Sequence, residues 1–417
     1  MSLNDTSSAQ RIKISFLGCT NAGKSSLVNA VTNQEVALVS DVKGTTTDPI
    51  GKSMEILPLG PVVIYDTPGF DDTGELGEKR IARTRRTMTN TDIGVIVIDS
   101  QEGITLADEE LIRSLISSKT PFIVAFNKED LCNGDDRIAL GNKLDEIATL
   151  MDTKKIPRVF VSATSARGIS ELRIAMAELL PDVKKDTKIV SDLLNKGDVA
   201  VLVCPIDESA PKDRLILPQM QTIRELVEYG VSTVVTTDDN LKDTLDSLKS
   251  APSIVITDSQ ALMKIKDIVP DEVPLTTFSI LMARYKGFLN EAAVGISAAR
   301  DLHNGAKILV CEGCTHHRQC NDIGTVKLPK AVKKYTGKDF NFEYTSGQSF
   351  PEDLSSYSML IHCGACMVND KEVAYRLGKA KEYNIPFTNY GITLAMASGT
   401  LERTLRVFPA LHDQIFG

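Results

Sequence analysis

Residues 18–25 have the sequence Gly-Cys-Thr-Asn-Ala-Gly-Lys-Ser. They lie between an apolar run, Ile12 to Leu17, and a segment typical of a helix, Ser26 to Thr32. This order of strand, glycine-rich loop and helix is the context that a phosphate-binding loop requires. Glycine lets the backbone turn its N–H groups toward phosphate oxygens, and the start of the following helix adds positive potential. We expect Lys24 to reach the terminal phosphates and the Ser25 hydroxyl to hold Mg²⁺.

A second motif, Asn127-Lys128-Glu129-Asp130, indicates which nucleotide binds. It ends the apolar run from Pro121 to Phe126, so it lies at the carboxyl end of a predicted strand, where doubly wound sheets bind ligands. The Asp130 carboxylate can accept hydrogen bonds from the ring N–H and the exocyclic amine of guanine. Adenine offers neither donor and would leave the carboxylate unpaired. The two motifs together predict GTP as the ligand.

Three further motifs complete a nucleotide site. Asp66-Thr67-Pro68-Gly69 follows the apolar run Val62 to Tyr65, and we expect Asp66 to hold Mg²⁺ through a water and the Gly69 N–H to sense the γ-phosphate. Gly44-Thr45-Thr46-Thr47 offers hydroxyls to the metal, with Thr46 favoured, and Ser162-Ala163 would flank the guanine. The five motifs predict a P-loop GTPase domain over residues 1–185, with Lys24, Thr46, Asp66 and Gly69 as its catalytic groups. The predicted GTP-binding residues are Gly18, Asn21, Ala22, Gly23, Lys24, Ser25, Ser26, Asn127, Lys128, Asp130, Ser162 and Ala163.

This part of the chain resembles the branch of small GTPases that includes the Era and TrmE proteins. In that branch an asparagine two residues before the second loop glycine coordinates K⁺, and Asn21 occupies this position here. Ras-like enzymes place a water-orienting glutamine near the position of Phe70, which has no polar side-chain atom. Phe70 can equally be a packing residue. The resemblance implies slow, K⁺-stimulated hydrolysis.

Composition places limits on the rest of the chain. Its 417 residues suggest about three domains. No apolar stretch approaches the roughly 20 residues of a membrane span, and the polar segment Met1 to Gln10 lacks the apolar core of a signal peptide, so we expect a cytoplasmic protein without membrane contact. The net charge of −8 argues against broad nucleic-acid binding, and no nucleic-acid partner is expected.

The eight cysteines are distributed unevenly. Cys19, Cys132 and Cys204 are scattered and are interpreted as structural, whereas five fall late in the chain: Cys311, Cys314, Cys320, Cys363 and Cys366. After residue 190, strand-like and helix-like runs alternate, which predicts mainly parallel sheets in two further α/β domains, residues 190–272 and 275–417. The late cysteines follow predicted strands, Lys307 to Val310 and Met359 to Ile361. If those strands are adjacent, Cys314 lies beside Cys363 and Cys366.

Two metal sites are compatible with these cysteines. Cys311 and Cys314 with Cys363 and Cys366 could form a closed, structural four-cysteine zinc site, although the pairs are separated by more than the roughly 15–20 residues of a zinc ribbon. Alternatively, Cys314, Cys363 and Cys366 offer three thiolates, which suit an iron–sulfur cluster with one iron open to exchange. Three roles are then open for His316 and His362. They could be ligands at the fourth position, they could donate hydrogen bonds that support the ligands, or they could be simple loop residues.

The late motifs carry a more specific resemblance. Cys314-Thr315-His316, Asp322-Ile323-Gly324 and His362-Cys363-Gly364-Ala365-Cys366, behind a GTPase domain, resemble the FeFe-hydrogenase maturation GTPases, the HydF family. The resemblance implies a 4Fe–4S cluster on the three motif cysteines and a transient di-iron subcluster, carried as a scaffold. It also implies homodimers formed through the middle domain, and two kinds of partner: radical-SAM hydrogenase maturases and the apo-FeFe-hydrogenase. Cys311 and Cys320 are thiols beyond the motif.

Two other functions remain open on the sequence alone. The chain could be a GTP-dependent regulatory protein with a structural zinc site, acting by binding. It could also be a tRNA-modification GTPase by analogy with TrmE, although its acidic charge and the lack of a recognisable RNA module weigh against that reading.

Overall fold

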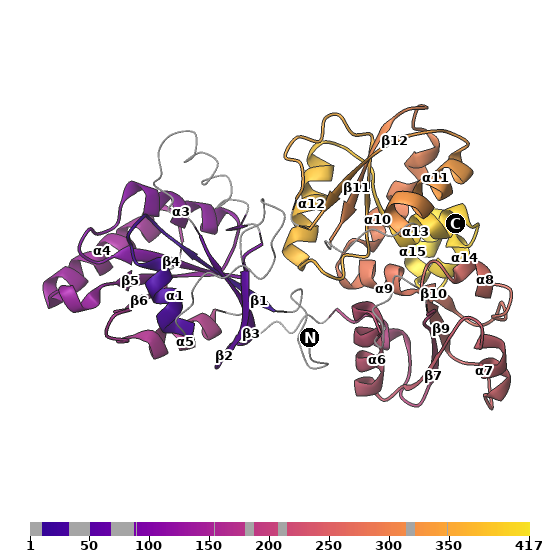
Figure 1. Ribbon diagram of the computed structural model, residues 1–417, viewed down its shortest axis with the longest axis horizontal. Helices are drawn as coiled ribbons and strands as arrows, with labels where there is room; N and C mark the ends of the chain where they lie inside the picture. The colour runs from indigo at the N-terminus through magenta and orange to yellow at the C-terminus, as the bar shows by residue number, and fades with distance from the viewer. Residues whose placement is uncertain are drawn as a thin grey trace. The chain divides into compact units, whose positions relative to one another are not determined.

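The strongest apolar runs of the chain form the strands of three sheets in a computed structural model (Figure 1). By its internal contacts the chain divides into two units, residues 1–184 and 185–417, and each is described by itself. The structure describes residues 11–32, 51–67, 87–88, 90–153, 155–179, 187–206, 215–313, 322–347 and 349–417.

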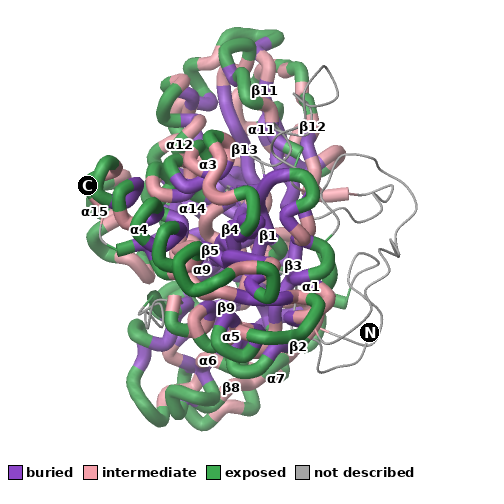
Figure 2. The backbone as a smooth tube through the Cα atoms, turned by 90° about the vertical axis from the view of Figure 1, so that its left-hand side faces the viewer, coloured by how far each residue is buried: buried purple, intermediate pink, exposed green. Residues whose placement is uncertain are grey.

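The first unit is built on a six-stranded sheet with the order β2-β3-β1-β4-β5-β6. Every neighbouring pair is parallel except β2 with β3. The central strands are buried along their lengths, as Figure 2 shows, which explains the nearly continuous apolar runs of β3, β4 and β5. β1 is also buried but carries Lys13 and Ser15 between its apolar residues. The strands are β1 (Ile12–Leu17), β2 (Gly51–Ile56), β3 (Gly60–Asp66), β4 (Ile93–Asp99), β5 (Phe122–Asn127) and β6 (Arg158–Phe160).

Helices of the first unit connect these strands, and two of them begin with reciprocal caps. Thr105 and Asp108 form a capping box at the start of α3, and Asn133 and Asp136 form another at the start of α4. The described helices of this unit are α1 (Lys24–Thr32), α3 (Leu106–Ser117), α4 (Gly134–Leu150) and α5 (Ile169–Glu178).

The second unit contains two four-stranded sheets, with the orders β10-β9-β7-β8 and β12-β11-β13-β14, and all their pairs are parallel. Their strands are β7 (Val199–Val203), β8 (Ser232–Thr236), β9 (Ile254–Thr257), β10 (Leu275–Thr277), β11 (Lys307–Glu312), β12 (Asn341–Ser346), β13 (Met359–His362) and β14 (Phe387–Asn389). The α/β class with mainly parallel sheets is therefore confirmed.

The helices of this unit are α6 (Leu217–Tyr229), α7 (Leu241–Ser247), α8 (Leu262–Ile265), α9 (Phe278–Tyr285), α10 (Leu289–Gly295), α11 (Leu328–Thr336), α12 (Asp370–Glu382), α13 (Tyr390–Ala397), α14 (Leu401–Leu405) and α15 (Pro409–Phe416). One hydrophobic core joins both sheets, because it contains Val201 and Val255 of the first together with Val310 and Ile361 of the second. Among the described helices, none is long and apolar enough to cross a membrane. The domain boundaries predicted within this unit stay a prediction.

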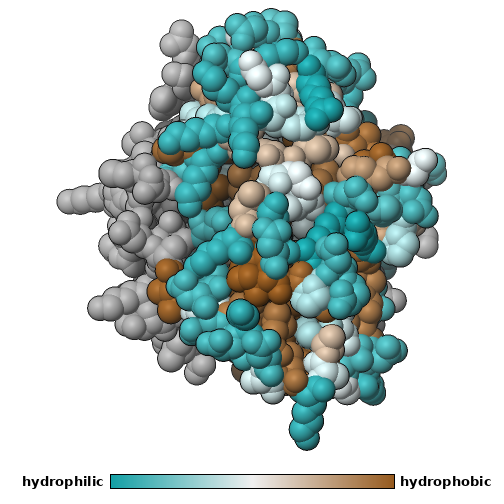
Figure 3. Space-filling view, turned by 90° about the vertical axis from the view of Figure 1, so that its right-hand side faces the viewer, coloured by the Kyte–Doolittle hydropathy of each residue, from teal (hydrophilic) through white to brown (hydrophobic). Residues whose placement is uncertain are grey.

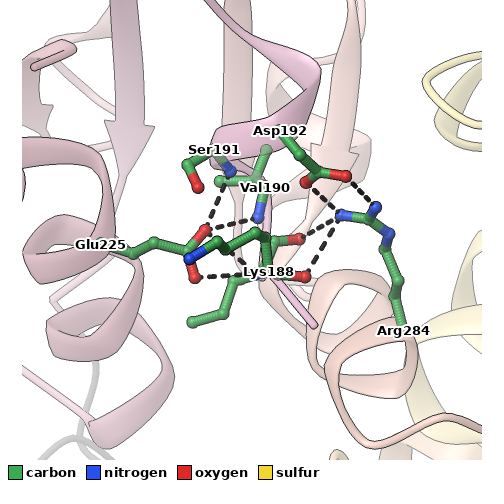
Figure 4. Close-up of polar contacts among 7 residues, drawn as sticks. Lys188, Val190, Ser191, Asp192, Glu225 and Arg284 are labelled. Atoms are coloured by element: carbon green, nitrogen blue, oxygen red, sulfur yellow. Dashed lines mark hydrogen bonds and ion pairs between the residues drawn. The ribbon is translucent and has the colours of Figure 1, made fainter. Parts of the chain in front are cut away.

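The segment that enters the second unit is fixed by two charged side chains (Figure 4). Glu225 on α6 accepts backbone N–H hydrogen bonds from Ile189, Val190 and Ser191, at 2.8–3.0 Å. Arg284 on α9 makes a two-pronged contact with the Asp192 carboxylate, in which its Nη1 lies 2.8 Å from Oδ1. The chain therefore enters this unit in a fixed conformation.

The structure corrects the sequence prediction at two places in the second sheet. β11 runs to Glu312, beyond the predicted end at Val310, so Cys311 lies inside the strand and is fully buried instead of following it. Cysteine is a small, apolar residue that fits a buried strand, and this explains the extension. β12 was not predicted; it is a partly exposed edge strand that pairs with β11 over its whole length.

Candidate GTP and cluster sites

The phosphate-binding loop has the backbone that its glycines permit. Gly18 and Gly23 have φ angles of 143° and 88°, in the region that favours glycine. A Cβ on Gly18 would lie 2.3 Å from the Val97 carbonyl oxygen, and one on Gly23 would lie 2.3 Å from Nδ2 of Asn127. Neither position has room for a side chain. The tight loop places the start of α1, at Lys24, at the carboxyl end of β1.

Charged and hydroxyl groups gather on this loop. The buried Lys24 ammonium donates to the carbonyl oxygens of Gly18, at 3.0 Å, and Cys19, at 2.6 Å. The Ser25 hydroxyl donates to Oδ2 of Asp66 at 2.6 Å, which links α1 to the end of β3. The other Asp66 oxygen, Oδ1, is buried without a hydrogen-bond partner. A serine hydroxyl and a carboxylate with an unused buried oxygen are the hard oxygen groups that suit Mg²⁺.

The guanine motif is tied to this loop by one buried side chain. Nδ2 of Asn127 donates to the Ala22 carbonyl oxygen at 3.0 Å, and its Oδ1 accepts from the Ala163 N–H at 3.2 Å. Lys128 has a positive φ of 63° and pairs with Asp99, while Asp130 is exposed. The structure therefore links residues of four of the five predicted motifs: the phosphate-binding loop, Asp66, the guanine motif and Ala163. Asn21 and Ser26 are exposed at the same loop. Thr46 and Gly69 lie outside the described residues.

The second sheet brings two cysteine-bearing segments to one edge. β11 and β13 are paired neighbours with Cys311 opposite His362, as the cluster prediction required. The residues that follow the two strands touch, because the Gly313 N–H donates to the Cys363 sulfur at 3.1 Å. The Ala365 N–H also reaches this sulfur, at 3.4 Å. Gly313 immediately precedes Cys314, which lies outside the described residues together with His316 and Cys320.

The thiols at this edge lack the surroundings of free thiolates. Burial raises the pKa of Cys363, against the two N–H hydrogen bonds that lower it, and burial raises the pKa of Cys366 to about 12. A coordinated metal removes the proton from a thiol and supplies the compensating charge. Two partly buried thiols on one turn, one with N–H donors already on its sulfur, fit an iron–sulfur cluster. Among the described residues alone, no group of three or more metal-ligating side chains is assembled.

His362 is held inside the protein by both ring nitrogens. Its Nδ1 lies 2.9 Å from the Cys363 carbonyl oxygen and its Nε2 lies 3.1 Å from Nη1 of Arg376. Burial, followed by the positive charge of Arg376, lowers the pKa of His362 to about 3. Of the roles predicted for His362, this position favours a supporting hydrogen-bond donor over an iron ligand.

The remaining described cysteines have other surroundings, although the Cys311 carbonyl oxygen accepts a hydrogen bond from the Cys363 N–H at 2.8 Å. Cys19 contacts the start of α3, with its sulfur 3.6 Å from Oδ1 of Asp108, and Cys204 is buried after β7. Cys311 is enclosed in β11, and burial raises its pKa to about 12. These positions give the zinc alternative little support from Cys311, because its side chain belongs to the core of the second unit.

Family models match the chain in three consecutive segments. A model described as the hydrogen maturase F dimerization domain matches residues 189–287, and one described as the hydrogen maturase F tetramerization domain matches residues 290–407. The chain belongs to the hydrogen maturase F family. A 50S ribosome-binding GTPase model matches residues 13–128. The segment that precedes the two maturase domains therefore matches a GTPase domain.

Individual relatives resemble part of the chain. GTPase Der of Maridesulfovibrio salexigens is 36% identical over 166 residues, covering 39% of this chain and 36% of that protein. The tRNA modification GTPase MnmE of Nitrosomonas europaea is 32% identical over 166 residues, covering 40% of this chain and 34% of that protein. The chain thus spans about a third of the length of these two relatives.

Among solved structures, Era in complex with MgGDPNP and a 16S ribosomal RNA fragment matches at 20% identity with a TM-score of 0.35. That match covers 54% of this chain and 93% of the Era chain. A likeness this low adds nothing to the family assignment.

We call residues 363–366 the cysteine turn. Sequence reasoning missed two residues that lie behind this turn, Glu372 and Arg376 on α12. Their spacing is that of an i,i+4 ion pair on a helix, a pattern that normally marks a solvent-exposed face. Both are instead fully buried. The spacing was the available signal, but nothing local in the sequence indicates that this face of α12 points inward.

Proposed function

We propose that the chain is a GTP-hydrolysing scaffold that holds a 4Fe–4S cluster and carries the di-iron unit of the FeFe-hydrogenase active site to the apo-enzyme. The observation that carries the cluster assignment is the hydrogen bond from Gly313 to the Cys363 sulfur. It joins the segment leading to Cys314 with the turn that holds Cys363 and Cys366. Such a juxtaposition of distant motifs is what a three-thiolate site needs.

Cys314, Cys363 and Cys366 would hold the cluster. When bound, the cluster supplies an iron with an exchangeable position, to which a second iron unit can attach and from which it can leave. The N–H groups of Gly313 and Ala365 stabilise negative charge on the Cys363 sulfur. His316, outside the described residues, remains a candidate for the fourth position. A closed zinc site would offer no exchangeable position.

In the first unit, Lys24 would neutralise phosphate charge, and Ser25 with Asp66 and Thr46 would hold Mg²⁺. The contact between the Ser25 hydroxyl and Asp66, with the unused Asp66 oxygen beside it, supports this placement. Asp130 would select guanine, and Gly69 would sense the γ-phosphate. Asn21, exposed at the loop, would coordinate K⁺ and so add positive charge where the transition state gathers negative charge.

The dimerization domain supports self-association, and we place the homodimer contact on the first sheet of the second unit. Large apolar side chains are exposed in this part, at Met220, Val227, Tyr229, Val235 and Met263. Figure 3 shows brown, apolar surface in the lower half of that view, on the side where α7 and α8 lie in Figure 1. β8 is an edge strand there, and edge strands with exposed apolar residues favour pairing with another chain. Radical-SAM maturases and the apo-hydrogenase would be the other partners.

The test is anaerobic reconstitution of the full chain with iron and sulfide, followed by iron and zinc analysis. We expect about four irons per chain. Cys314→Ala, Cys363→Ala and Cys366→Ala should each lose most of this iron and fail to activate apo-hydrogenase, while GTP hydrolysis continues. The matched control is Cys132→Ala in the GTPase domain, which should keep the iron. One tight zinc per chain, with no iron uptake after its removal, would support the regulatory protein with a structural zinc site instead.

A further inference from the structure

A buried ion pair lies behind the cysteine turn. Arg376 and Glu372, one helical turn apart on α12, are 0% and 1% exposed, and Nε of Arg376 lies 2.7 Å from Oε1 of Glu372. Burying a charged pair costs desolvation energy that an apolar pair would avoid. A buried cation at this place therefore calls for a function beyond packing.

Of the other two guanidinium nitrogens of Arg376, one is directed toward the cysteine turn and one toward the residue that follows β12. Nη1 contacts Nε2 of His362 at 3.1 Å, and Nη2 donates to the Gly347 carbonyl oxygen at 2.6 Å. Arginine has no acceptor, so Nε2 of His362 must accept, and the ring proton is then on Nδ1. That proton is donated to the Cys363 carbonyl oxygen, 2.9 Å away. A continuous chain of hydrogen bonds thus runs from Glu372 through Arg376 and His362 to the backbone of Cys363.

Along this series of hydrogen bonds, the positive charge lies nearer to the cysteine turn than the negative charge does. The carboxylate of Glu372 is at the far end, and the guanidinium of Arg376 stands between it and the Cys363 turn. Only two hydrogen bonds, from Arg376 to His362 and from His362 to the Cys363 carbonyl oxygen, separate the guanidinium from this turn, so its positive charge lies close to the proposed cluster ligand. A cluster held by three thiolates carries net negative charge, which grows by one unit on reduction. A fixed cation nearby favours the more negative, reduced form.

We propose that Arg376 is a positioning residue that orients the Cys363 turn through His362 and raises the reduction potential of the cluster. Glu372 opposes that effect by partly compensating the cation. This inference rests on the proposed cluster site. It predicts effects of opposite sign for two neighbouring side chains, which a purely structural role would not produce.

The test uses the full chain reconstituted with iron and sulfide under argon. The reduced cluster is followed by electron paramagnetic resonance during a dithionite titration with redox mediators. At the potential where half the wild-type clusters are reduced, the ratio of reduced to oxidised cluster should fall about tenfold in Arg376→Gln and rise in Glu372→Gln, the order expected for one partly screened unit charge. Arg376→Lys retains the charge and should stay within about threefold of wild type.

Equal ratios in all variants, or a change of the same sign in both glutamine variants, would overturn the inference and leave Arg376 a packing residue. If Arg376→Gln does not fold, the Glu372→Gln variant decides alone. An unchanged or lowered ratio of reduced to oxidised cluster in that variant would contradict the claim that Glu372 partly compensates the charge of Arg376. A wild-type chain that takes up no iron refutes the proposed function and this inference together. Iron uptake by wild type with unshifted variants refutes only the inference.

Discussion

Asn127→Ala is the sharpest test of how the nucleotide site is assembled. The Asn127 side chain is 2% exposed and makes two hydrogen bonds, to the Ala22 carbonyl oxygen at 3.0 Å and from the Ala163 N–H at 3.2 Å. Losing the bond from the half-buried Ala163 N–H costs about 1 kcal/mol, and leaving the buried Ala22 carbonyl oxygen unpaired costs ~1–3 kcal/mol. We expect the free energy that holds the nucleotide-binding loops in place to fall by roughly 2–4 kcal/mol. GTP affinity should therefore fall about 30-fold or more.

The assay is the dissociation constant of a fluorescent GTP analogue, measured beside the thermal unfolding midpoint. The control is Asn133→Ala, the same substitution in the same unit, which removes the N-cap of α4 and costs about 1 kcal/mol of stability. Asn133 caps α4 through Asp136, so its variant should bind GTP within about twofold of wild type. If Asn127→Ala binds GTP as tightly as the Asn133 variant, the bridging role of Asn127 is wrong.

Three further predictions concern charge. Lys24→Ala should abolish tight GTP binding, and Asp130→Asn should lower the preference for guanine over adenine nucleotides at least about tenfold, by competition binding; unchanged affinity and selectivity would contradict the site. GTP hydrolysis should be faster in K⁺ than in Na⁺ at equal ionic strength. Equal rates would contradict the proposal that Asn21 coordinates K⁺. The hydrogen bonds from Arg284 hold the pKa of Asp192 below its usual value. The Arg284–Asp192 contact therefore stabilises the folded state above about pH 4, and this stabilisation is lost as the pH falls through the lower pKa of the folded state. Asp192→Asn should lower the thermal unfolding midpoint at pH 7 more than at pH 3.

The nucleotide site was predictable because its residues belong to short motifs at strand ends. The backbone of Gly18 and Gly23 and the linkage of Ser25 to Asp66 agree with the local chemistry that the motifs indicate. The apolar runs before each motif also predicted the strands, since a strand buried on both faces needs an unbroken run. The bridge made by Asn127 was not predicted, because it depends on how strands distant in sequence are ordered in the sheet.

The second unit was predictable to a lesser depth. Alternating runs predicted its parallel sheets, whereas the adjacency of β11 and β13 was only a condition of the cluster prediction, and the structure supplies it. The strand before the first late cysteine was predicted to end at Val310, so Cys311 was expected to follow it, although β11 continues through Cys311. β12 was missed because its segment, Asn341–Ser346, mixes charged and aromatic residues as an edge strand does, and no continuous apolar run marks it.

The cysteine turn is held in place by residues that lie outside the cysteine motif, so the motif alone does not predict the geometry of this site. Lys286, which follows α9, donates to the Val368 carbonyl oxygen at 2.9 Å and pairs with Asp370 at 3.0 Å, on the segment after Cys366. α9 itself follows β10 of the first sheet, within the segment matched by the dimerization model. From the other side the turn is held by Arg376 through His362. The turn that carries two of the three proposed ligands is thus fixed by elements of both maturase segments. This is consistent with the single core that the two sheets share, and it makes the geometry of the site a property of the whole second unit.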